Sequence, residues 1–413
     1  MKIIHINLSD TQGGAGRAMN RIHTGLLKAG INSQIYTINK NSNDKSVKEF
    51  NMLSCIGNKI NRKILSFPKK VLKDESKGLF SFCLLPSWGL IKAINKIDAD
   101  IIHLHWIQGE MLPIYALNKF NKPVVWTLHD MWPLNGGYHY FEINSKNLLS
   151  SSTNMSIKKL LENIIQNWLI SLKIKYYTNN ITFIAPSKWM SDCAKKSLIT
   201  KNMDVKIIGN GIDTFAWKPT PKKIAKNNLG INENEFVIAF GAISSDKDPR
   251  KGYDLVVNAI ENFTQNNKNL STNLLMFGGD GNPDDFSTRV KFISFKHVNN
   301  DAKLQQIYSA ADLMLVPSRQ EAFGQTALES LACGTPVVSF NVGGLRDIVE
   351  HGISGYLAKP FSAESLADGI NWVLDQSDSD KLYHSCRQKA HKFSLDHVAN
   401  KHQQLYKKLI KSI

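Results

Sequence analysis

The sequence predicts an α/β protein with two Rossmann-like domains in tandem. Its 413 residues exceed what one core of ordinary size needs and fit two domains of roughly 200 residues each. Strand-like apolar runs alternate with helix-length segments, which is typical of βαβ units and a parallel sheet. The alternation restarts after Asp213, so it describes two sheets rather than one.

Each predicted strand is a short apolar run that a helix-length segment separates from the next. In the first half of the chain the runs are residues 2–8, 33–38, 100–106, 123–130, 181–187 and 205–211. In the second half they are residues 235–243, 273–281, 291–295, 312–318 and 335–340. Ligands of open parallel sheets bind beyond the carboxyl ends of the strands, so motifs at those ends have the most weight.

The domain limits follow from composition. Gly and Pro concentrate in residues 209–223, directly after a strand, which predicts a hinge. We therefore expect an N-terminal domain over residues 1–208 and a C-terminal domain over residues 209–380. Residues 381–413 have a helical pattern and form a third segment.

A glycine-rich turn, Gly13-Gly14-Ala15-Gly16, leads from the first strand into an amphipathic helix. Such a turn lets backbone amides and a helix N-terminus approach phosphate oxygens. A nicotinamide cofactor would need a GxGxxG spacing and an acid after the second strand, where Asn39 stands instead. A purely structural turn and a contact with a sugar-nucleotide phosphate or an acceptor both remain open.

Two pairs of residues at strand ends include histidine. His129 and Asp130 precede Pro133 and a Gly-Gly pair, which favours an irregular loop. Such a histidine is suited to bonding a substrate hydroxyl or stabilising a positive transition state, and a structural core histidine is the alternative. His103 and His105 alternate within one strand and could pair as metal ligands. No third ligand with suitable spacing appears, so we expect no metal.

Two adjacent cations, Arg250 and Lys251, precede Gly252 at the start of a helix in the second domain. Positive charge there opposes the helix dipole at a cost of roughly a few tenths of a kcal/mol per residue. An anion would compensate both charges. A diphosphate is the natural candidate, because Lys acts on phosphate as a point charge and Arg as a fork. An ordinary solvated basic loop is the alternative.

Residues 312–340 predict a buried strand, a loop, a short helix that Gly334 ends, and the next buried strand. Glu321 lies in the loop, and Glu329 lies inside the helix. The helix N-terminal amides, at residues 323–326, form an anion site, and carboxylates on either side can accept hydrogen bonds from hydroxyls. A nucleoside diphospho-sugar presents these groups in the matching order: sugar hydroxyls, diphosphate, ribose hydroxyls.

Together these motifs resemble those of retaining glycosyltransferases of the GT-B fold, in family 4, which use nucleotide-activated sugars. The resemblance covers nearly the full length and is densest over residues 317–360, which contain a Glu-(seven residues)-Glu motif and the loop at Gly343 and Gly344. It implies two Rossmann-like domains facing each other across a cleft. It also implies a C-terminal helix that crosses back to the N-terminal domain. The N-terminal domain would bind the acceptor, and the C-terminal domain would bind the donor.

The resemblance implies roles for individual residues. Glu321 would bond hydroxyls of the donor sugar, Glu329 would bond the ribose, and His129 would lie beside the anomeric carbon. The predicted catalytic residues are His129, Glu321 and Lys251. The predicted donor-binding residues are Gly14, Arg250, Lys251, Phe323, Gly324, Gln325, Thr326 and Glu329. The predicted acceptor-side residues are Gly13, Gly16, Arg17 and Asp130.

One position departs from the family pattern. The family usually has an Arg, in a Gly-Arg-Leu context, after the strand that leads to Lys251. This chain reads Gly241-Ala242-Ile243. Arg250 would have to supply the missing charge from a different backbone position, and without it the diphosphate would be held less tightly.

The implied activity is transfer of a hexose-type unit from a UDP- or GDP-sugar to a glycan acceptor, free or lipid-linked, with retained configuration. The implied context is polysaccharide, O-antigen, lipopolysaccharide or capsule biosynthesis. No DxD-type pair stands at a strand end that would face the cleft, so we expect neither a metal nor another cofactor. Two alternatives stay open: a sugar-nucleotide epimerase of the same fold, and a non-catalytic sugar-nucleotide-binding subunit.

The net charge of +16 is unevenly distributed: +14 in residues 1–200, −5 in residues 201–380 and +7 in residues 381–413. This asymmetry suggests an anionic partner. Residues 56–74 and 156–177 mix Lys with apolar residues at helical spacing, which is typical of helices at an anionic membrane surface. Ordinary amphipathic helices with solvated lysines are the alternative. We expect no nucleic-acid partner, since no helix-turn-helix pattern or aromatic-studded strand accompanies the charge.

The expected location is the cytoplasm, at the inner face of the membrane if the acceptor is lipid-linked. The five cysteines are scattered and lack CxxC spacing, which argues against a disulfide framework or a zinc site. The first strand begins at once, without a cationic lead, so we expect no signal peptide. No apolar run approaches the roughly 18 residues that span a bilayer.

Overall fold

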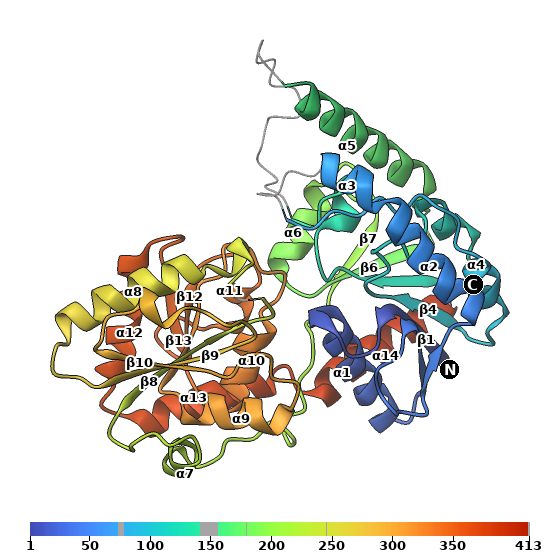
Figure 1. Ribbon diagram of the computed structural model, residues 1–413. Coiled ribbons are helices and arrows are strands. Elements are labelled where there is room, and N and C mark those ends of the chain that lie inside the picture. Colours follow the sequence, from blue (N-terminus) through green and yellow to red (C-terminus); the bar gives the residue numbers. More distant parts are fainter. Residues whose placement is uncertain (73–77, 141–155, 179, 245, 412–413) are drawn as a thin grey trace. The chain divides into compact units, whose positions relative to one another are not determined.

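The computed structural model describes residues 1–72, 78–140, 156–178, 180–244 and 246–411 (Figure 1). The chain forms two compact units. Unit 1 consists of Met1–Gly211 and Asp396–Ile413, and unit 2 of Ile212–Leu395. Each unit contains one parallel sheet covered by helices, so the predicted fold class of two Rossmann-like domains is confirmed.

Unit 1 is built on a 7-stranded sheet with the order β3-β2-β1-β4-β5-β6-β7. Its strands are β1 (Lys2–Ser9), β2 (Asn32–Asn39), β3 (Val47–Glu49), β4 (Ile101–Leu104), β5 (Val124–Thr127), β6 (Ile181–Ala185) and β7 (Asp204–Ile207). Its helices are α1 (Gly13–Lys28), α2 (Met52–Ile64), α3 (Ser66–Leu72), α4 (Leu90–Lys96), α5 (Ile157–Tyr176), α6 (Lys188–Lys196) and α14 (Leu395–Lys411). The described part of unit 1 also contains the 3-10 helices η2 (Ile114–Lys119) and η3 (Trp132–Leu134).

Unit 2 is built on a 6-stranded sheet with the order β10-β9-β8-β11-β12-β13. Its strands are β8 (Phe236–Gly241), β9 (Thr272–Phe277), β10 (Val290–Ser294), β11 (Leu313–Val316), β12 (Val337–Phe340) and β13 (Gly355–Ala358). Its helices are α7 (Lys222–Asn227), α8 (Tyr253–Asn266), α9 (Asp301–Ala310), α10 (Gln325–Ala332), α11 (Leu345–Ile348), α12 (Ala363–Leu374) and α13 (Ser379–His391). Two 3-10 helices are η4 (Pro249–Lys251) and η5 (Pro283–Asp285).

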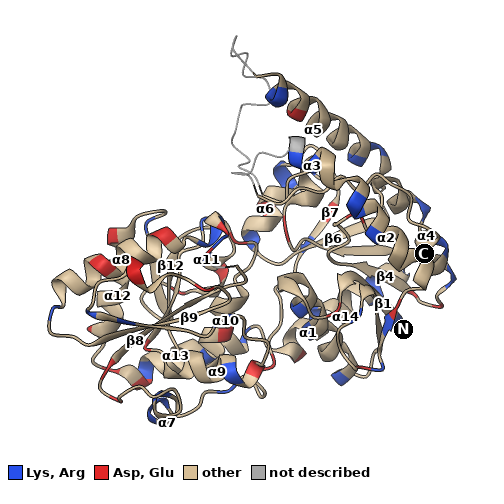
Figure 2. Cartoon of the chain, viewed as in Figure 1, with Lys and Arg blue, Asp and Glu red and all other residues tan. Residues whose placement is uncertain are grey.

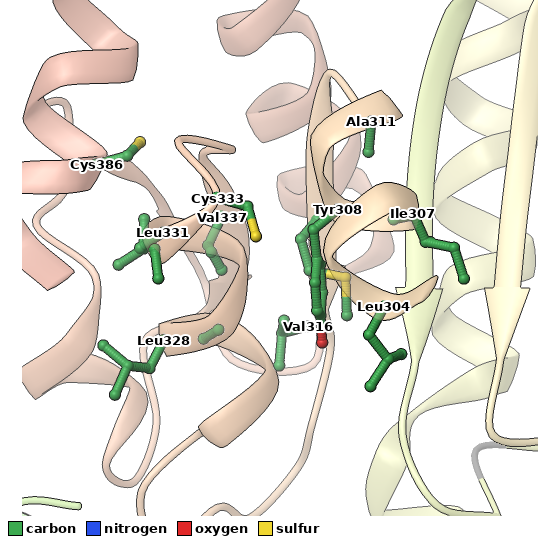
Figure 3. Packing of buried hydrophobic residues seen from close by; sticks show 14 of the residues in the cluster. Leu304, Ile307, Tyr308, Ala311, Val316, Leu328, Leu331, Cys333, Val337 and Cys386 are labelled. Atoms are coloured by element: carbon green, nitrogen blue, oxygen red, sulfur yellow. The ribbon is translucent and has the colours of Figure 1, made fainter. Parts of the chain in front are cut away.

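Successive side chains of β8 point to opposite faces of the unit 2 sheet, and each face has its own hydrophobic core. Phe236, Ile238 and Phe240 pack with α8 and α12, whereas Val237 and Ala239 belong to the cluster of α9, α10 and α13. Figure 3 shows part of the second cluster, in which side chains of α9 and α10 meet around the end of β11. A strand that is buried on both faces reads as a continuous apolar run, which is why the sequence identified it.

The last helix joins unit 1, as the resemblance implied. Val398, Ala399, Leu405 and Tyr406 of α14 are buried in one cluster with residues of α1 and of the unit 1 strands. The expected segment 381–413 began too early, however. Helix α13 belongs to unit 2, where Leu382, Cys386 and Ala390 pack into its core, and the chain passes to unit 1 only at Asp396.

Buried imidazoles line the face of the unit 1 sheet that α1 and α14 cover. His5 of β1 and His103 of β4 are register partners, and the Tyr406 hydroxyl lies 2.7 Å from His103 Nδ1. Burial lowers the pKa of His23 on α1 to about 4 and that of His402 on α14 to about 3. Burial also holds the pKa of His5 and of His103 well below 6.5.

We expect the free energy of unfolding to fall as the pH decreases from 6.5 towards 4. An unfolded chain protonates its imidazoles near pH 6.5, whereas the folded chain keeps the pKa of His23 at about 4. The unfolded chain therefore binds more protons in this window, and each such histidine removes up to about 1.4 kcal/mol per pH unit. Urea denaturation at a series of pH values measures the slope. A His402→Gln variant should show a shallower slope, and a flat profile for the natural chain would contradict the burial of neutral imidazoles.

Candidate functional site

In unit 2, a lysine and a glutamate meet beside the carboxyl ends of two neighbouring strands. Lys251 is the last residue of η4, in the connection after β8, and Glu321 lies in the loop after β11. Lys251 Nζ donates to Glu321 Oε2 at 2.8 Å, and the two side chains are 20% and 17% exposed. The structure thus brings together two of the three predicted catalytic residues, at the sheet edge where ligands of parallel sheets bind.

A glycine lets these two loops approach. Gly252, which has φ +72°, lies so near the β11 loop that a Cβ there would be 2.3 Å from the Pro317 carbonyl oxygen. The backbone N–H of Arg319 donates to the Arg250 carbonyl at 2.7 Å, which ties the loops together. The Lys-Gly pair of the sequence is therefore a geometric requirement, because only glycine tolerates both the backbone conformation and the contact.

Helix α10 begins at the same place. Its N-cap is Gly324, which has φ +108° and no side chain that could cap the helix. Thr326, in the first turn, lines a small pocket with Lys251. The pocket is completed by the ends of β8 and β11 and the residues after them: Phe240, Gly241, Ala242, Leu315, Val316, Pro317 and Ser318. A helix N-terminus and a lysine on one pocket make it suited to an anion.

A second pair of glycines supports Glu321 from behind. Gly344 donates its N–H to the Glu321 carbonyl at 2.8 Å. A Cβ on Gly343, which has φ +54°, would lie 2.4 Å from the same carbonyl oxygen. A Cβ on Gly344 would lie 2.5 Å from the Ala322 carbonyl oxygen. The Gly-Gly loop therefore shapes the backbone of the glutamate motif.

The second glutamate of the motif lies deeper. Glu329 is 3% exposed, and its Oε2 accepts a hydrogen bond of 3.0 Å from the Tyr308 hydroxyl. Tyr308, on α9, is itself part of the core shown in Figure 3. The predicted contact of Glu329 with a ribose stays a prediction, and so do the diphosphate contacts predicted for Phe323 to Thr326.

The protein compensates the charge of Arg250 itself. Nε and an Nη of Arg250 donate to the two carboxylate oxygens of Asp248, at 3.1 and 2.5 Å. The sequence favoured an external anion for Arg250 and Lys251 together, but the structure gives each an internal carboxylate partner. Both contacts are within reach of solvent, since the side chains of Arg250 and Asp248 are 30% and 23% exposed.

In unit 1, the glycine-rich turn follows β1 directly, and α1 begins at Gly13. Gly13 has φ +74°, and a Cβ there would meet nothing within 4 Å, whereas one on Gly16 would approach the Ser9 carbonyl to 3.1 Å. Gly16 therefore fits the helix closely against the end of β1. The donor contact predicted for Gly14 and the acceptor contacts predicted for Gly13, Gly16 and Arg17 stay predictions.

His129 and Asp130 follow β5, but they have different environments. His129 is partly exposed, and burial lowers its pKa to about 4. Asp130 is buried: Oδ2 accepts hydrogen bonds from Trp106 Nε1 at 2.8 Å and His139 Nδ1 at 2.6 Å. Its Oδ1 accepts the Trp132 N–H at 3.0 Å. Burial raises the Asp130 pKa, but His139 and these hydrogen bonds outweigh it and lower the value overall. Asp130 thus organises the loop in which His129 lies.

The structure corrects the expectation that His103 and His105 lack a third histidine. His5 joins them, and one ring nitrogen from each lies within 4.8 Å of the others. The sequence could not show this, because β1 and β4 are about a hundred residues apart and only the register of the sheet aligns His5 with His103. Our expectation of a metal-free protein stays a prediction.

Two family models match this chain in tandem. "Glycosyltransferase Family 4" matches residues 12–215, and "Glycosyl transferases group 1" matches residues 221–393. The first match contains His129, and the second contains the Lys251–Glu321 pair. The chain belongs to glycosyltransferase family 4. Its two parallel-sheet units form the GT-B fold, which the sequence motifs had suggested.

Individual relatives are distant from this family 4 member. A D-inositol 3-phosphate glycosyltransferase of Gordonia bronchialis is 25% identical over 319 residues, which are 73% of this chain. The chain spans 64% of that protein's length, and 54% and 43% of two other curated relatives.

Solved structures establish the fold more completely. Sucrose-phosphate synthase from Thermosynechococcus elongatus has a TM-score of 0.67 at 20% identity, with 100% of both chains covered. The Anabaena protein Alr3699/HepE, solved in complex with UDP and glucose, has a TM-score of 0.64 at 19% identity. That match covers 99% of this chain and 100% of the Anabaena chain. At these identities the likeness concerns the fold alone.

Replacing Gly343 by Ala should destabilise unit 2 more than the same change at Gly352. Both glycines have positive φ, at +54° and +76°, so each substitution costs about 1–2 kcal/mol through the backbone. Only at Gly343 would the new methyl group also overlap the Glu321 carbonyl, which adds about 1–3 kcal/mol. Urea denaturation of the two variants measures the difference. Equal losses would show that the loop moves away without effect on Glu321.

Proposed function

We propose that this family 4 member transfers a hexose-type sugar from a UDP- or GDP-sugar to a hydroxyl of a glycan acceptor, free or lipid-linked. The observation that carries the proposal is the Lys251–Glu321 pair beside the N-terminus of α10, on a pocket at the ends of β8 and β11. A positive group, backbone amides and a carboxylate together match a diphosphate joined to a sugar. The Anabaena structure with UDP and glucose supports a UDP-linked donor.

Donor binding would exchange the partners of this pair. Diphosphate oxygens would take the Lys251 ammonium that now donates to Glu321, and Glu321 would accept hydrogen bonds from sugar hydroxyls. Without donor, the ion pair keeps two partly buried charges compensated, because an unpaired charge there would be unfavourable. As the bond from the sugar to the diphosphate breaks, Lys251 and the helix amides stabilise the charge that develops on the leaving group.

We further propose that the transfer retains the configuration and needs no metal. In a front-face route, the acceptor oxygen bonds the anomeric carbon on the side from which the diphosphate leaves, and a leaving-group oxygen takes the acceptor proton. Lys251 and the α10 N-terminus supply the positive charge that a metal would otherwise supply. The contact of His129 with the sugar and acceptor binding by the N-terminal domain stay predictions. Polysaccharide, O-antigen, lipopolysaccharide or capsule synthesis stays the predicted context.

A non-catalytic sugar-nucleotide-binding subunit is the second candidate. It is favoured by Ala242, where the family usually has Arg, and by the Asp248 partner of Arg250, which competes for that charge. A thermal-shift screen of nucleotide-sugars identifies the donor in either case, because a ligand stabilises the folded chain according to its affinity. Binding without turnover on any acceptor would refute the proposed transfer in favour of the non-catalytic subunit. Conversion of the donor to an epimer would refute it in favour of an epimerase.

Lys251→Ala should lower kcat/KM for sugar transfer by about 10²–10³, as expected when one donor to a developing anion is removed. The matched control is Lys389→Ala, because Lys389 pairs with Glu350 at 2.8 Å in the same unit, away from the strand-end pocket. The control should reduce stability and leave kcat/KM unchanged. Addition of EDTA should not change the rate of the natural chain. A rate that EDTA abolishes and Mg²⁺ restores would refute the metal-independent route.

The structure also bears on the proposed membrane contact of unit 1. Helices α2 and α5 bury their polar side and expose their apolar side. The buried residues are Ser54, Gly57, Asn58 and Asn61 on α2, and Glu162, Gln166, Leu169 and Lys173 on α5. The exposed apolar residues are Met52, Leu53, Ile56, Ile60, Ile64 and Phe67 on α2 and α3, and Ile157, Leu160, Leu161, Ile164, Trp168 and Ile174 on α5. Residues 73–74, the end of the first basic stretch, lie outside the described residues.

Hydrogen bonds explain the inverted burial. Lys173 Nζ donates to the carbonyls of Trp132, Asn135 and Gly136, and Asn61 Nδ2 donates to the Pro86 carbonyl at 2.9 Å. The polar faces are therefore needed inside. Figure 2 shows Lys and Arg along α2, α3 and α5. The exposed basic residues include Lys59, Arg62, Lys63, Lys158, Lys159 and Lys175.

An anionic membrane surface suits apolar side chains among exposed cations better than water does. We therefore propose that this face contacts such a surface. No helix among the described residues is both long and apolar enough to cross a bilayer, so the contact would be peripheral. The cytoplasmic location stays a prediction.

The double variant Ile164→Ser, Trp168→Ser should bind vesicles that contain phosphatidylglycerol at least roughly tenfold more weakly than the natural chain. Each side chain is about half exposed, so burying it in lipid would contribute on the order of 1 kcal/mol. The control Phe215→Ser, Ile353→Ser removes apolar residues of unit 2 that are at least as exposed, and it should bind as the natural chain does. Equal binding of all three proteins, or binding that does not depend on the anionic lipid, would show that this face is not the membrane contact.

A further inference from the structure

Three histidines of unit 1 form a hydrogen-bonded row that ends at His129. His5 Nδ1 lies 2.9 Å from His105 Nε2, and His105 Nδ1 lies 2.9 Å from His129 Nε2. His5 is on β1, His105 directly follows β4, and His129 follows β5, so the row crosses three neighbouring strands. In each contact, Nδ1 of one ring faces Nε2 of the next ring towards His129.

The two ends of the row differ. At the inner end, His5 Nε2 is buried and has no hydrogen-bond partner among the described residues. At the outer end, His129 is partly exposed, and no hydrogen bond to its Nδ1 is found in the described part of the chain. The row therefore connects a closed interior position to an atom that a ligand can reach.

The ends determine where the protons are. Burial lowers the pKa of His129 to about 4 and holds the pKa of His5 and of His105 well below 6.5, so each ring carries one N–H at neutral pH. Two arrangements satisfy both hydrogen bonds: all three protons on Nδ1, or all three on Nε2. The second would leave an N–H of His5 buried without an acceptor. Buried donors are left unpaired less often than acceptors, so the first arrangement is favoured.

We propose that His105 and His5 are positioning residues that fix the proton of His129 on Nδ1, where it donates a hydrogen bond to a substrate oxygen. In this arrangement His5 Nδ1–H donates to His105, His105 Nδ1–H donates to His129 Nε2, and His129 Nδ1–H points to the ligand. The outermost histidine is then a hydrogen-bond donor and not a base. This suits contact with a hydroxyl or a leaving-group oxygen, and it excludes proton abstraction by this atom.

The surrounding groups favour a hydrogen-bonded row over a metal site. The remaining close histidine, His103, uses both nitrogens, for Thr127 Oγ1 at 2.8 Å and the Tyr406 hydroxyl at 2.7 Å. A metal bound at roughly 2.0–2.1 Å by His5, His103 and His105 would have to break a hydrogen bond of His103 and one of His105, because both ring nitrogens of these two residues already have partners. His23 and His402, the other imidazoles near this cluster, also have a lowered pKa because they are buried.

The tautomer can be read directly. The inference rests on the proposed role of His129, but long-range ¹H–¹⁵N NMR of the full chain with ¹⁵N-labelled histidine reports the proton position without substrate or turnover. We expect protonated Nδ1 and unprotonated Nε2 for all three rings. A proton on His129 Nε2 would overturn the inference even if the chain is an active transferase. The expected tautomer in a chain without activity would instead leave the row intact and refute the proposed function.

Two substitutions of His105 separate positioning from packing. The amide of Asn reaches the place of Nδ1 and can still donate to His129, whereas that of Gln reaches the place of Nε2 and cannot. His105→Gln should lower kcat about ten- to a hundredfold, by analogy with the loss of a partner that orients a metal-binding histidine. It should leave the KM for the donor unchanged. His105→Asn should keep kcat within about threefold and keep the proton of His129 on Nδ1.

The control is His402→Gln, a buried histidine of the same region outside the row, which should lower Tm and leave both kcat and the His129 tautomer unchanged. Equal loss of kcat in His105→Asn and His105→Gln would reduce the row to packing and overturn the inference. A zinc titration would also overturn the inference under one set of results. In these results, one equivalent of zinc binds the natural chain and shifts the signals of His5, His103 and His105, and zinc has no effect on the His5→Gln variant.

Discussion

The ion pair of Lys251 and Glu321 is the contact on which the candidate site of unit 2 depends. It joins the connection after β8 to the loop after β11, two strands that are neighbours in the sheet. Neither side chain could reach the other if the backbones stood further apart. Gly252 lets the connection after β8 approach Pro317, and the Gly343-Gly344 loop packs against the backbone of Glu321 and Ala322. A methyl group at any of these glycines would overlap a carbonyl oxygen. The chemistry of the site therefore rests on the absence of side chains around it.

The polar groups at the two candidate sites differ in kind. Unit 2 places charges in pairs at the rim of its sheet, as in Lys251 with Glu321 and Arg250 with Asp248. Unit 1 instead buries imidazoles under α1 and α14 and keeps them neutral, since burial lowers the pKa of each. Charge pairs can exchange partners when an anion binds, whereas neutral rings can hold a defined proton. A donor site needs the first property, and a residue that must donate one hydrogen bond needs the second.

The sequence predicted most of the fold because the central strands are buried on both faces and read as apolar runs. It did not identify β3 or β13, which are short edge strands without such a run, and it began the returning helix too early because α13 and α14 have similar helical patterns. Glu321, Lys251 and the glycine loops were found because their motifs are local. His5 was not associated with His103, because register between β1 and β4 is a property of the sheet and not of either strand. The Asp248 partner of Arg250 was missed, although it lies only two residues away.

The inverted helices α2 and α5 show where folding and function separate. Gln166 and Lys173 are inside because they bond loop backbone that would otherwise be buried without partners; Gln166 Oε1, for example, accepts the Gly137 N–H at 2.7 Å. This explains the polar interior but not the apolar exterior, since Ser or Lys at Ile164 or Trp168 would be compatible with the same interior contacts. Exposed apolar area does not stabilise the unit by itself. Its presence beside lysines on two adjoining segments therefore needs a cause outside the fold, and a surface that offers both hydrocarbon and negative charge supplies one.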